Sequence, residues 1–116
     1  MNQSKEFLET LLSYTKYNKK AIGWQSLTVD ATVAGVSLTI PANATYALIV
    51  VESTVTSGSV IRYLECGNTI TTVTSTVGIP RAHLDAFDVQ GAENLTNFRA
   101  IQVTAGTHQL SIQYYK

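Results

Sequence analysis

The feature that most constrains the fold of this chain is a change in hydrophobic periodicity at Lys19-Lys20. Before that point, apolar side chains recur at the three- and four-residue spacing of a helix, at Phe7, Leu8, Leu11 and Leu12. After it, short runs rich in Thr, Val and Ile alternate with a period of two, and Gly, Asn and Pro separate the runs. The sequence therefore predicts an N-terminal helical anchor, residues 1–20, followed by a β domain, residues 21–116.

The anchor is predicted to be an amphipathic helix from about residue 4 to residue 17. Ser4 can cap its first turn, where Glu6 is favourable, and Lys16 suits the negative end of the helix dipole. A helix this short is marginal in water, so its apolar stripe must pack on the body, on copies of itself or on a partner. We expect the stripe to dock on another protein through Phe7, Leu8, Leu11 and Leu12.

The β domain is predicted to be an all-β antiparallel sandwich of seven or eight strands. Alternating or continuous apolar runs occupy residues 25–30, 36–40, 46–52, 60–65, 86–89, 98–103 and 109–115. Such spacing favours a jelly-roll or related Greek-key topology, with an immunoglobulin-like arrangement as the second choice. Residues 70–77 are predicted to form an edge or a loop arm, and residues 93–97 a single helical turn. The predicted core consists of Leu38, Ile40, Leu48, Val50, Ile61, Tyr63, Phe87, Phe98, Ile101, Leu110 and Ile112.

Charge and cysteine content limit the classes of partner. The chain of 116 residues has a formal net charge of zero, with +2 in residues 1–20 and −2 in the remainder. A β domain of net negative charge has no general attraction for phosphate backbones, so no nucleic-acid partner is expected. Cys66 is the only cysteine, which excludes an intramolecular disulfide. No signal peptide or membrane-spanning run is apparent, and no membrane partner is expected.

The titratable residues do not form a familiar catalytic or metal-binding pattern. Cys66, His83 and His108 could supply a thiol and a base, but no protease signature surrounds the cysteine. His83, Asp85 and Asp88 lie within six residues, yet calcium normally requires more oxygen ligands at closer spacing. We therefore expect no catalytic residues, no cofactor and no metal. A small hydrolase centred on Cys66, or on Asp85 and Asp88, is the catalytic alternative.

Three aromatic residues are candidates for ligand or interface contacts. Trp24, Tyr114 and Tyr115 could stack on sugar rings, as in carbohydrate-binding modules. Aromatic residues more often seal the ends of a sandwich or lie in a subunit interface. A glycan is therefore the secondary candidate ligand.

Four segments of the β domain carry a resemblance to a known group of proteins. They are VSLTIPANATYALIVVE at 36–52, IRY at 61–63, LTNFRAI at 95–101 and LSIQYY at 110–115. Together with Gly78, they resemble small β-sandwich proteins encoded among the virion structural genes of tailed bacteriophages, of the head decoration or fibre accessory type. The similarity covers roughly residues 22–115 and leaves the anchor outside.

This resemblance implies a non-enzymatic component of a virus particle. The expected location is the virion, after synthesis in the cytoplasm of a bacterial host. The expected partners are other virion proteins, either capsid or tail subunits, and further copies of the chain, with a trimer favoured. A carbohydrate-binding receptor module of a phage tail or fibre is the alternative.

Overall fold

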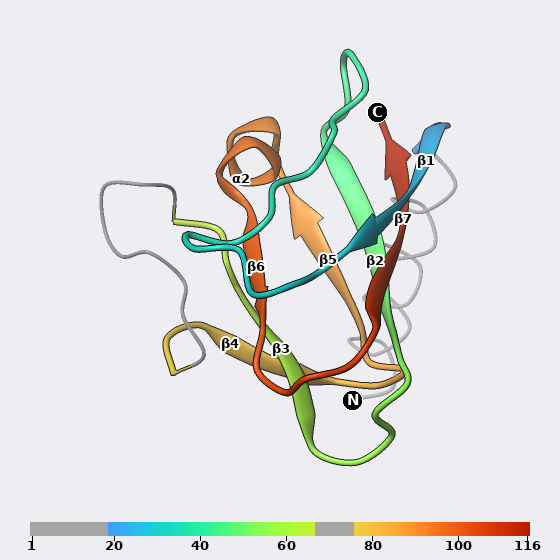
Figure 1. Ribbon diagram of the computed structural model, residues 1–116. Coiled ribbons are helices and arrows are strands. Elements are labelled where there is room, and N and C mark those ends of the chain that lie inside the picture. Colours follow the sequence, from blue (N-terminus) through green and yellow to red (C-terminus); the bar gives the residue numbers. More distant parts are fainter. Residues whose placement is uncertain (1–18, 67–75) are drawn as a thin grey trace, which may run out of the picture.

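The computed structural model describes residues 19–66 and 76–116, and within them the chain forms two antiparallel β-sheets (Figure 1). The larger sheet has the order β1-β7-β2-β5, with β1 Ala21–Thr28, β7 His108–Tyr115, β2 Tyr46–Ser53 and β5 Ala86–Gln90. The smaller sheet has the order β4-β3-β6, with β4 Ile79–Ala82, β3 Ser59–Leu64 and β6 Arg99–Gln102. One short helix, α2 Ala92–Asn97, lies between β5 and β6. The all-β, antiparallel prediction is confirmed.

Alternation of side chains along the strands of the larger sheet builds one wall of the core. In β7, Leu110, Ile112 and Tyr114 are buried, as the sequence pattern predicted for this strand. In β2, the odd-numbered residues Ala47, Ile49 and Val51 are fully buried. Successive side chains of a strand point to opposite faces, so the even-numbered residues of β2 face outward.

The prediction that Leu48 and Val50 belong to the core is therefore wrong. Leu48 is 40% exposed, and Val50 is only half-buried. The run of apolar residues in β2 offers apolar side chains to both faces, and the period alone does not say which face is inward. The choice follows from packing against the second sheet.

An aromatic stack joins the two sheets. Tyr63 of β3 stacks on Phe87 of β5 with ring centroids 4.3 Å apart and an interplanar angle of 11°. The ring of Phe98, the residue just before β6, has its centroid 5.6 Å from that of Tyr63. The guanidinium of Arg81 lies over the rings of Phe87 and Tyr63, 5.1 Å and 5.7 Å from their centroids. Stacked rings and a cation above them stabilise the core beyond simple burial.

Other predicted elements are found with altered limits. β1 begins at Ala21, four residues before the predicted start, and the predicted strand at 36–40 forms only a bridge from Val36 to Ala100.

β4 was not predicted, because Pro80 interrupts its pattern. It is an edge strand of the smaller sheet, where a missing N–H is tolerated. The predicted anchor helix at 4–17 and nearly all of the arm at 70–77 lie outside the described residues.

The inward and outward faces of β2 predict losses of stability of different size on truncation. Ile49→Ala removes a fully buried side chain from the core, and we expect it to lower the free energy of unfolding by about 2–5 kcal/mol. Leu48→Ala changes the adjacent, outward residue and should cost less than about 1 kcal/mol. Urea denaturation of both variants measures the difference. Equal losses would contradict the assigned faces.

Candidate functional site: the outer face of the larger sheet

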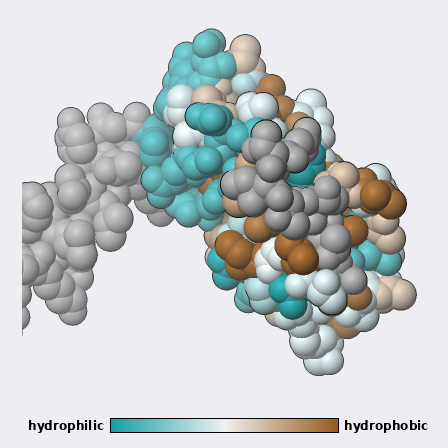
Figure 2. Space-filling model, turned by 90° about the vertical axis from the view of Figure 1, so that its left-hand side faces the viewer, coloured by the Kyte–Doolittle hydropathy of each residue, from teal (hydrophilic) through white to brown (hydrophobic). Residues whose placement is uncertain are grey.

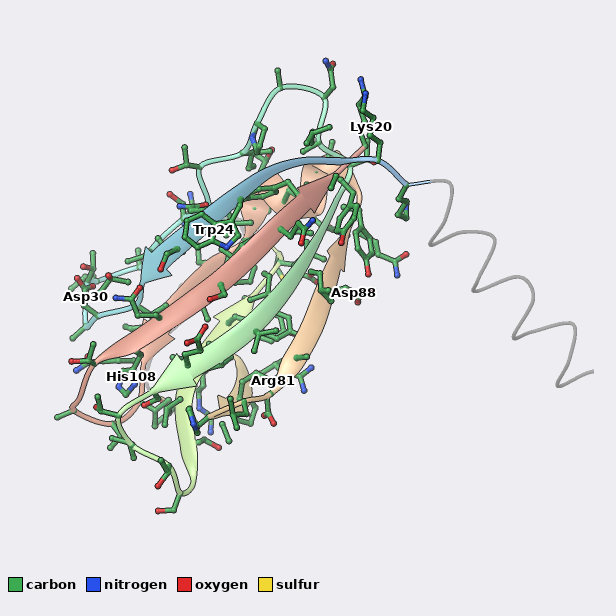
Figure 3. All side chains as sticks on the ribbon, turned by 90° about the vertical axis from the view of Figure 1, so that its right-hand side faces the viewer. Lys20, Trp24, Asp30, Arg81, Asp88 and His108 are labelled. Atoms are coloured by element: carbon green, nitrogen blue, oxygen red, sulfur yellow. The ribbon has the colours of Figure 1, made fainter. Side chains whose placement is uncertain are left out.

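The larger sheet turns one face to the core and leaves the other face on the outside of the described structure (Figure 3). One row of cross-strand neighbours on this outer face runs from Trp24 to Gln113, then to Leu48 and to Asp88. The next row contains Ser26, Ser111, Val50 and Ala86. We call this surface the Trp24 face.

Trp24 and Leu48 are exposed large hydrophobic residues on the Trp24 face. Trp24 is 69% exposed, and Figure 3 shows its side chain on the outer side of the sheet. An open depression on this face is lined by Trp24, Leu48, Val50, Ser111, Ile112 and Gln113. Burying the apolar surface of an exposed indole is favourable. A partner that covers Trp24 would therefore gain binding free energy.

The opposite side of the molecule has a different surface. Figure 2 shows hydrophobic residues there in several places, among pale and hydrophilic ones. Ile79 and Leu84 are among the exposed hydrophobic residues of the β4–β5 region. Scattered exposed hydrophobic residues are common on protein surfaces and need no special explanation. Trp24, in contrast, shares one continuous sheet face with Leu48 and Val50.

A cluster around Tyr46 closes one end of the Trp24 face. The ring of Tyr46 packs edge-on against Tyr115, with centroids 5.5 Å apart. The Tyr46 hydroxyl donates to a carboxylate oxygen of Asp88 at 3.1 Å, and Gln90 Nε2 donates to the same oxygen at 3.1 Å. Lys19 Nζ lies 4.9 Å from the centroid of the Tyr46 ring. The chain therefore joins the β domain at the edge of this face.

Burial and neighbouring charge shift the ionisation of residues near this face. Burial, together with the hydrogen bond to Asp88 and its negative charge, raises the pKa of Tyr46 to about 12. Burial alone raises the pKa of Tyr114 to about 12. Burial, followed by the charge of Asp88, also raises the pKa of Glu65. The raised pKa values of Tyr46 and Glu65 indicate that Asp88 creates a negative potential at this end of the sheet.

The three candidate aromatic residues have different positions. Trp24 is on the outer face, and Tyr115 is half-buried against Tyr46. Tyr114 is only 1% exposed, and its hydroxyl donates to Gln25 Oε1 at 2.6 Å. The suggestion that Tyr114 contacts a ligand or a partner is therefore wrong, because it shares the inward face of β7. The docking residues Phe7, Leu8, Leu11 and Leu12 lie outside the described residues.

The structure does not bring Cys66 together with the histidines. Cys66 is exposed, two residues beyond the end of β3 at Leu64. His83 lies near the other end of that strand, because its neighbour Ala82 pairs with Ser59. The side-chain arrangement needed for a cysteine nucleophile and a histidine base is not formed here.

The acidic residues near His83 also point in different directions. A carboxylate oxygen of Asp85 accepts a hydrogen bond from the backbone N–H of Ala82 at 2.7 Å, which stabilises the turn. Asp88 lies on the Trp24 face, and His83 Nδ1 accepts from the backbone N–H of Ser53. Within residues 19–66 and 76–116, no three His, Cys, Asp or Glu residues are grouped as metal ligands require.

His108 forms a buried polar contact that the sequence did not reveal. It is fully buried, with Nε2 2.6 Å from the carbonyl oxygen of Thr104 and Nδ1 2.7 Å from Ser53 Oγ. A carbonyl oxygen can only accept, so Nε2 carries a proton and donates it to Thr104, while Nδ1 is hydrogen-bonded to the Ser53 hydroxyl. A Cβ on Gly106 would come within 3.3 Å of the His108 ring and 2.9 Å of Val55. His108 therefore ties the end of β2 to the loop between β6 and β7 in a closed site.

Sequence reasoning also missed the outward position of Leu48 and Val50. Glu52 gave a signal that could have been used. It is an even-numbered residue of β2, like Leu48 and Val50, so it lies on the same face of the strand, and it is exposed there. A charged residue is costly to bury without a partner, so its parity marks the outward face of β2.

Comparison of the chain with protein-family models, with curated proteins and with solved structures finds no match. In the part of the chain that the structure describes, no helix has the length and apolar character needed to cross a bilayer. The Trp24 face is consequently the strongest observation on which a function can be argued.

The raised pKa values of Tyr46 and Tyr114 predict late ionisation and a loss of stability at high pH. Both phenols should ionise near pH 12 in the folded protein, and Tyr46→Phe and Tyr114→Phe should each remove one late-titrating tyrosine from an absorbance titration. In the unfolded chain they ionise near pH 10, so folding stability should fall as pH rises from about 10 to 12. Titration of all tyrosines near pH 10 in the folded protein would contradict this.

Proposed function

We propose that this protein is a non-enzymatic structural component of a tailed-phage particle, a head decoration or accessory module. It docks on other virion proteins through residues 1–20 and assembles as a multimer, with a trimer favoured. The single observation that carries the proposal is the Trp24 face, with Trp24 69% exposed beside Leu48 and Val50.

The strand order supports a jelly roll as the specific form of the β domain. If the segment at Val36, which bridges to Ala100, is counted with the smaller sheet, its order becomes β4-β3-β6-Val36. Passing along the chain, β1, β2, β5 and β7 belong to the larger sheet, while the Val36 segment, β3, β4 and β6 belong to the smaller one. This alternation is that of a double Greek key, an architecture used in viral capsid proteins and lectins. The fold alone does not assign a function.

The chemistry of the Trp24 face suits protein contact. An exposed tryptophan with aliphatic neighbours and short polar side chains such as Ser111 resembles the centre of a protein interface, where aromatic anchors contribute most of the binding energy. Repeated copies on a particle multiply weak contacts, so each subunit needs only a modest surface.

A carbohydrate-binding receptor module of a tail or fibre is the second candidate. The observation that favours it is the position of Trp24 beside Gln113 and Ser111. An indole ring can support the apolar face of a sugar, while amide and hydroxyl groups bond to its hydroxyls.

The particle proposal predicts the protein in purified virions. Particles produced by the phage that encodes this chain should contain it in a fixed copy number, measured by quantitative mass spectrometry against the major capsid subunit. Its complete absence from purified particles of normal infectivity would refute the structural role.

The sugar alternative is tested on a glycan array with two variants. If sugars bind the Trp24 face, Trp24→Ala should abolish the signal, because it removes the stacking platform. Leu84→Ala, which alters an exposed residue in the β4–β5 loop, is the matched control and should bind as well as the wild type. The absence of any glycan signal from the wild type would leave the protein-contact function as the better account.

A further inference from the structure

We infer that the Trp24 face is the docking surface for residues 4–17 of a neighbouring copy of this chain. The inference rests on the proposed function, because it names the partner through which the multimer forms. Three features of the chain point to this occupant: its apolar stripe, its charges and the place where it leaves the β domain.

The stripe and the face match in character and in size. Residues 4–17 are predicted to form a helix with one apolar side, and Leu8, Leu11 and Leu12 lie near its middle. Fourteen helical residues span about 21 Å. The eight-residue strands β1, β2 and β7 are about 27 Å long. The helix therefore fits along the face and can cover Trp24, Leu48 and Val50 together.

The charges of the two surfaces are complementary. The four strands of the larger sheet contain no Lys or Arg, and their only acidic residues, Glu52 and Asp88, both lie on the Trp24 face. Within the described residues, Asp88 accepts hydrogen bonds from Tyr46 and Gln90, and Glu52 accepts one from Ser111. These hydrogen-bond donors are all neutral groups. Both carboxylates remain open to a cation.

Two lysines of the predicted helix are placed to meet these carboxylates. At 100° per residue, Lys5 and Lys16 project along one border of the apolar stripe, next to Leu12, and Glu9 lies on the same border, about 20° beyond Lys16. The two lysines are separated by about 17 Å along the helix. Asp88 pairs with Leu48, four residues from Glu52, which separates the two carboxylates by about 13 Å along the strand. Flexible lysine side chains can span this difference.

The point where the chain enters the β domain favours a neighbouring copy over the same copy. Lys20 and Lys116 exchange backbone hydrogen bonds of 3.1 Å and 2.9 Å, so the chain is already aligned with β7 when it enters β1. Lys19 is held over Tyr46 at the end of the face. Only Asn18 lies between Lys19 and the predicted helix end at residue 17. A helix that continues outward from this end reaches another subunit without the reversal needed to return to its own face.

Such a contact joins two different surfaces of identical chains. The interface is therefore head-to-tail, and it closes when the copies form a ring. A ring of three copies would give the favoured trimer. In that ring every anchor lies on a neighbouring copy, so residues 4–17 would join the subunits to one another and contacts with other virion proteins would use other surfaces.

A complementation experiment in the full chain tests this arrangement. Leu11→Lys damages the anchor, Leu48→Lys damages the face, and Thr10→Lys and Ser57→Lys add the same charge at positions off the stripe and off the face. Light scattering coupled to size-exclusion chromatography gives the mass of each species. The wild type and both controls should be oligomeric, and each damaged variant alone should be monomeric. An equimolar mixture of the two damaged variants should form a one-to-one dimer, because one intact junction remains.

Three results would overturn the inference. A monomeric wild type would show that the anchor docks on its own face or elsewhere. An oligomeric Leu11→Lys variant would show a contact that does not use the stripe. A mixture that stays monomeric would show that anchor and face do not bind each other. In each case, detection of the protein in purified particles would still support its role as a particle component, so the failure of that role and the failure of this inference are distinguishable.

Discussion

The contact between the two sheets through Tyr63, Phe87 and Phe98 is the constraint on which the rest of the structure depends. These three rings come from β3, from β5 and from the residue just before β6, so their stacking sets the two sheets against each other. Once Phe87 points inward, its cross-strand partner Ile49 points inward as well. The alternation of side chains then directs Leu48 and Asp88 outward, and the composition of the Trp24 face follows from the packing of the core.

The sequence predicts most of the strands but not all of their faces. The pattern in β7 is unambiguous, because Gln109, Ser111 and Gln113 alternate with buried residues. The pattern in β2 is ambiguous over residues 47–51, since this central stretch has apolar residues on both sides and only Glu52, near its end, marks the outward face. Pro80 interrupts the strand pattern of β4, so this edge strand is not apparent from the sequence. Its position depends on pairing with β3. Long-range pairing of this kind cannot be read from local periodicity.

The candidate site was predictable only in part, because its residues come from strands that pair over long distances in the sequence. Trp24 was singled out as an aromatic contact residue, and it is exposed. Its neighbours come from strands that are distant along the chain, with Leu48 in β2 and Gln113 in β7. The buried contact between His108 and Ser53 likewise joins residues 55 positions apart. Such groupings arise from sheet topology, and only the folded structure displays them.

We propose that the Trp24 face is covered when the full chain assembles. Trp24 is the only tryptophan in the sequence, so its fluorescence reports on this face directly. The emission maximum and the quenching by iodide can be measured as the protein concentration is raised through the assembly range. We expect a shift to shorter wavelength and a loss of quenching as oligomers form. An oligomer in which Trp24 stays as accessible to iodide as in the monomer would contradict the claim.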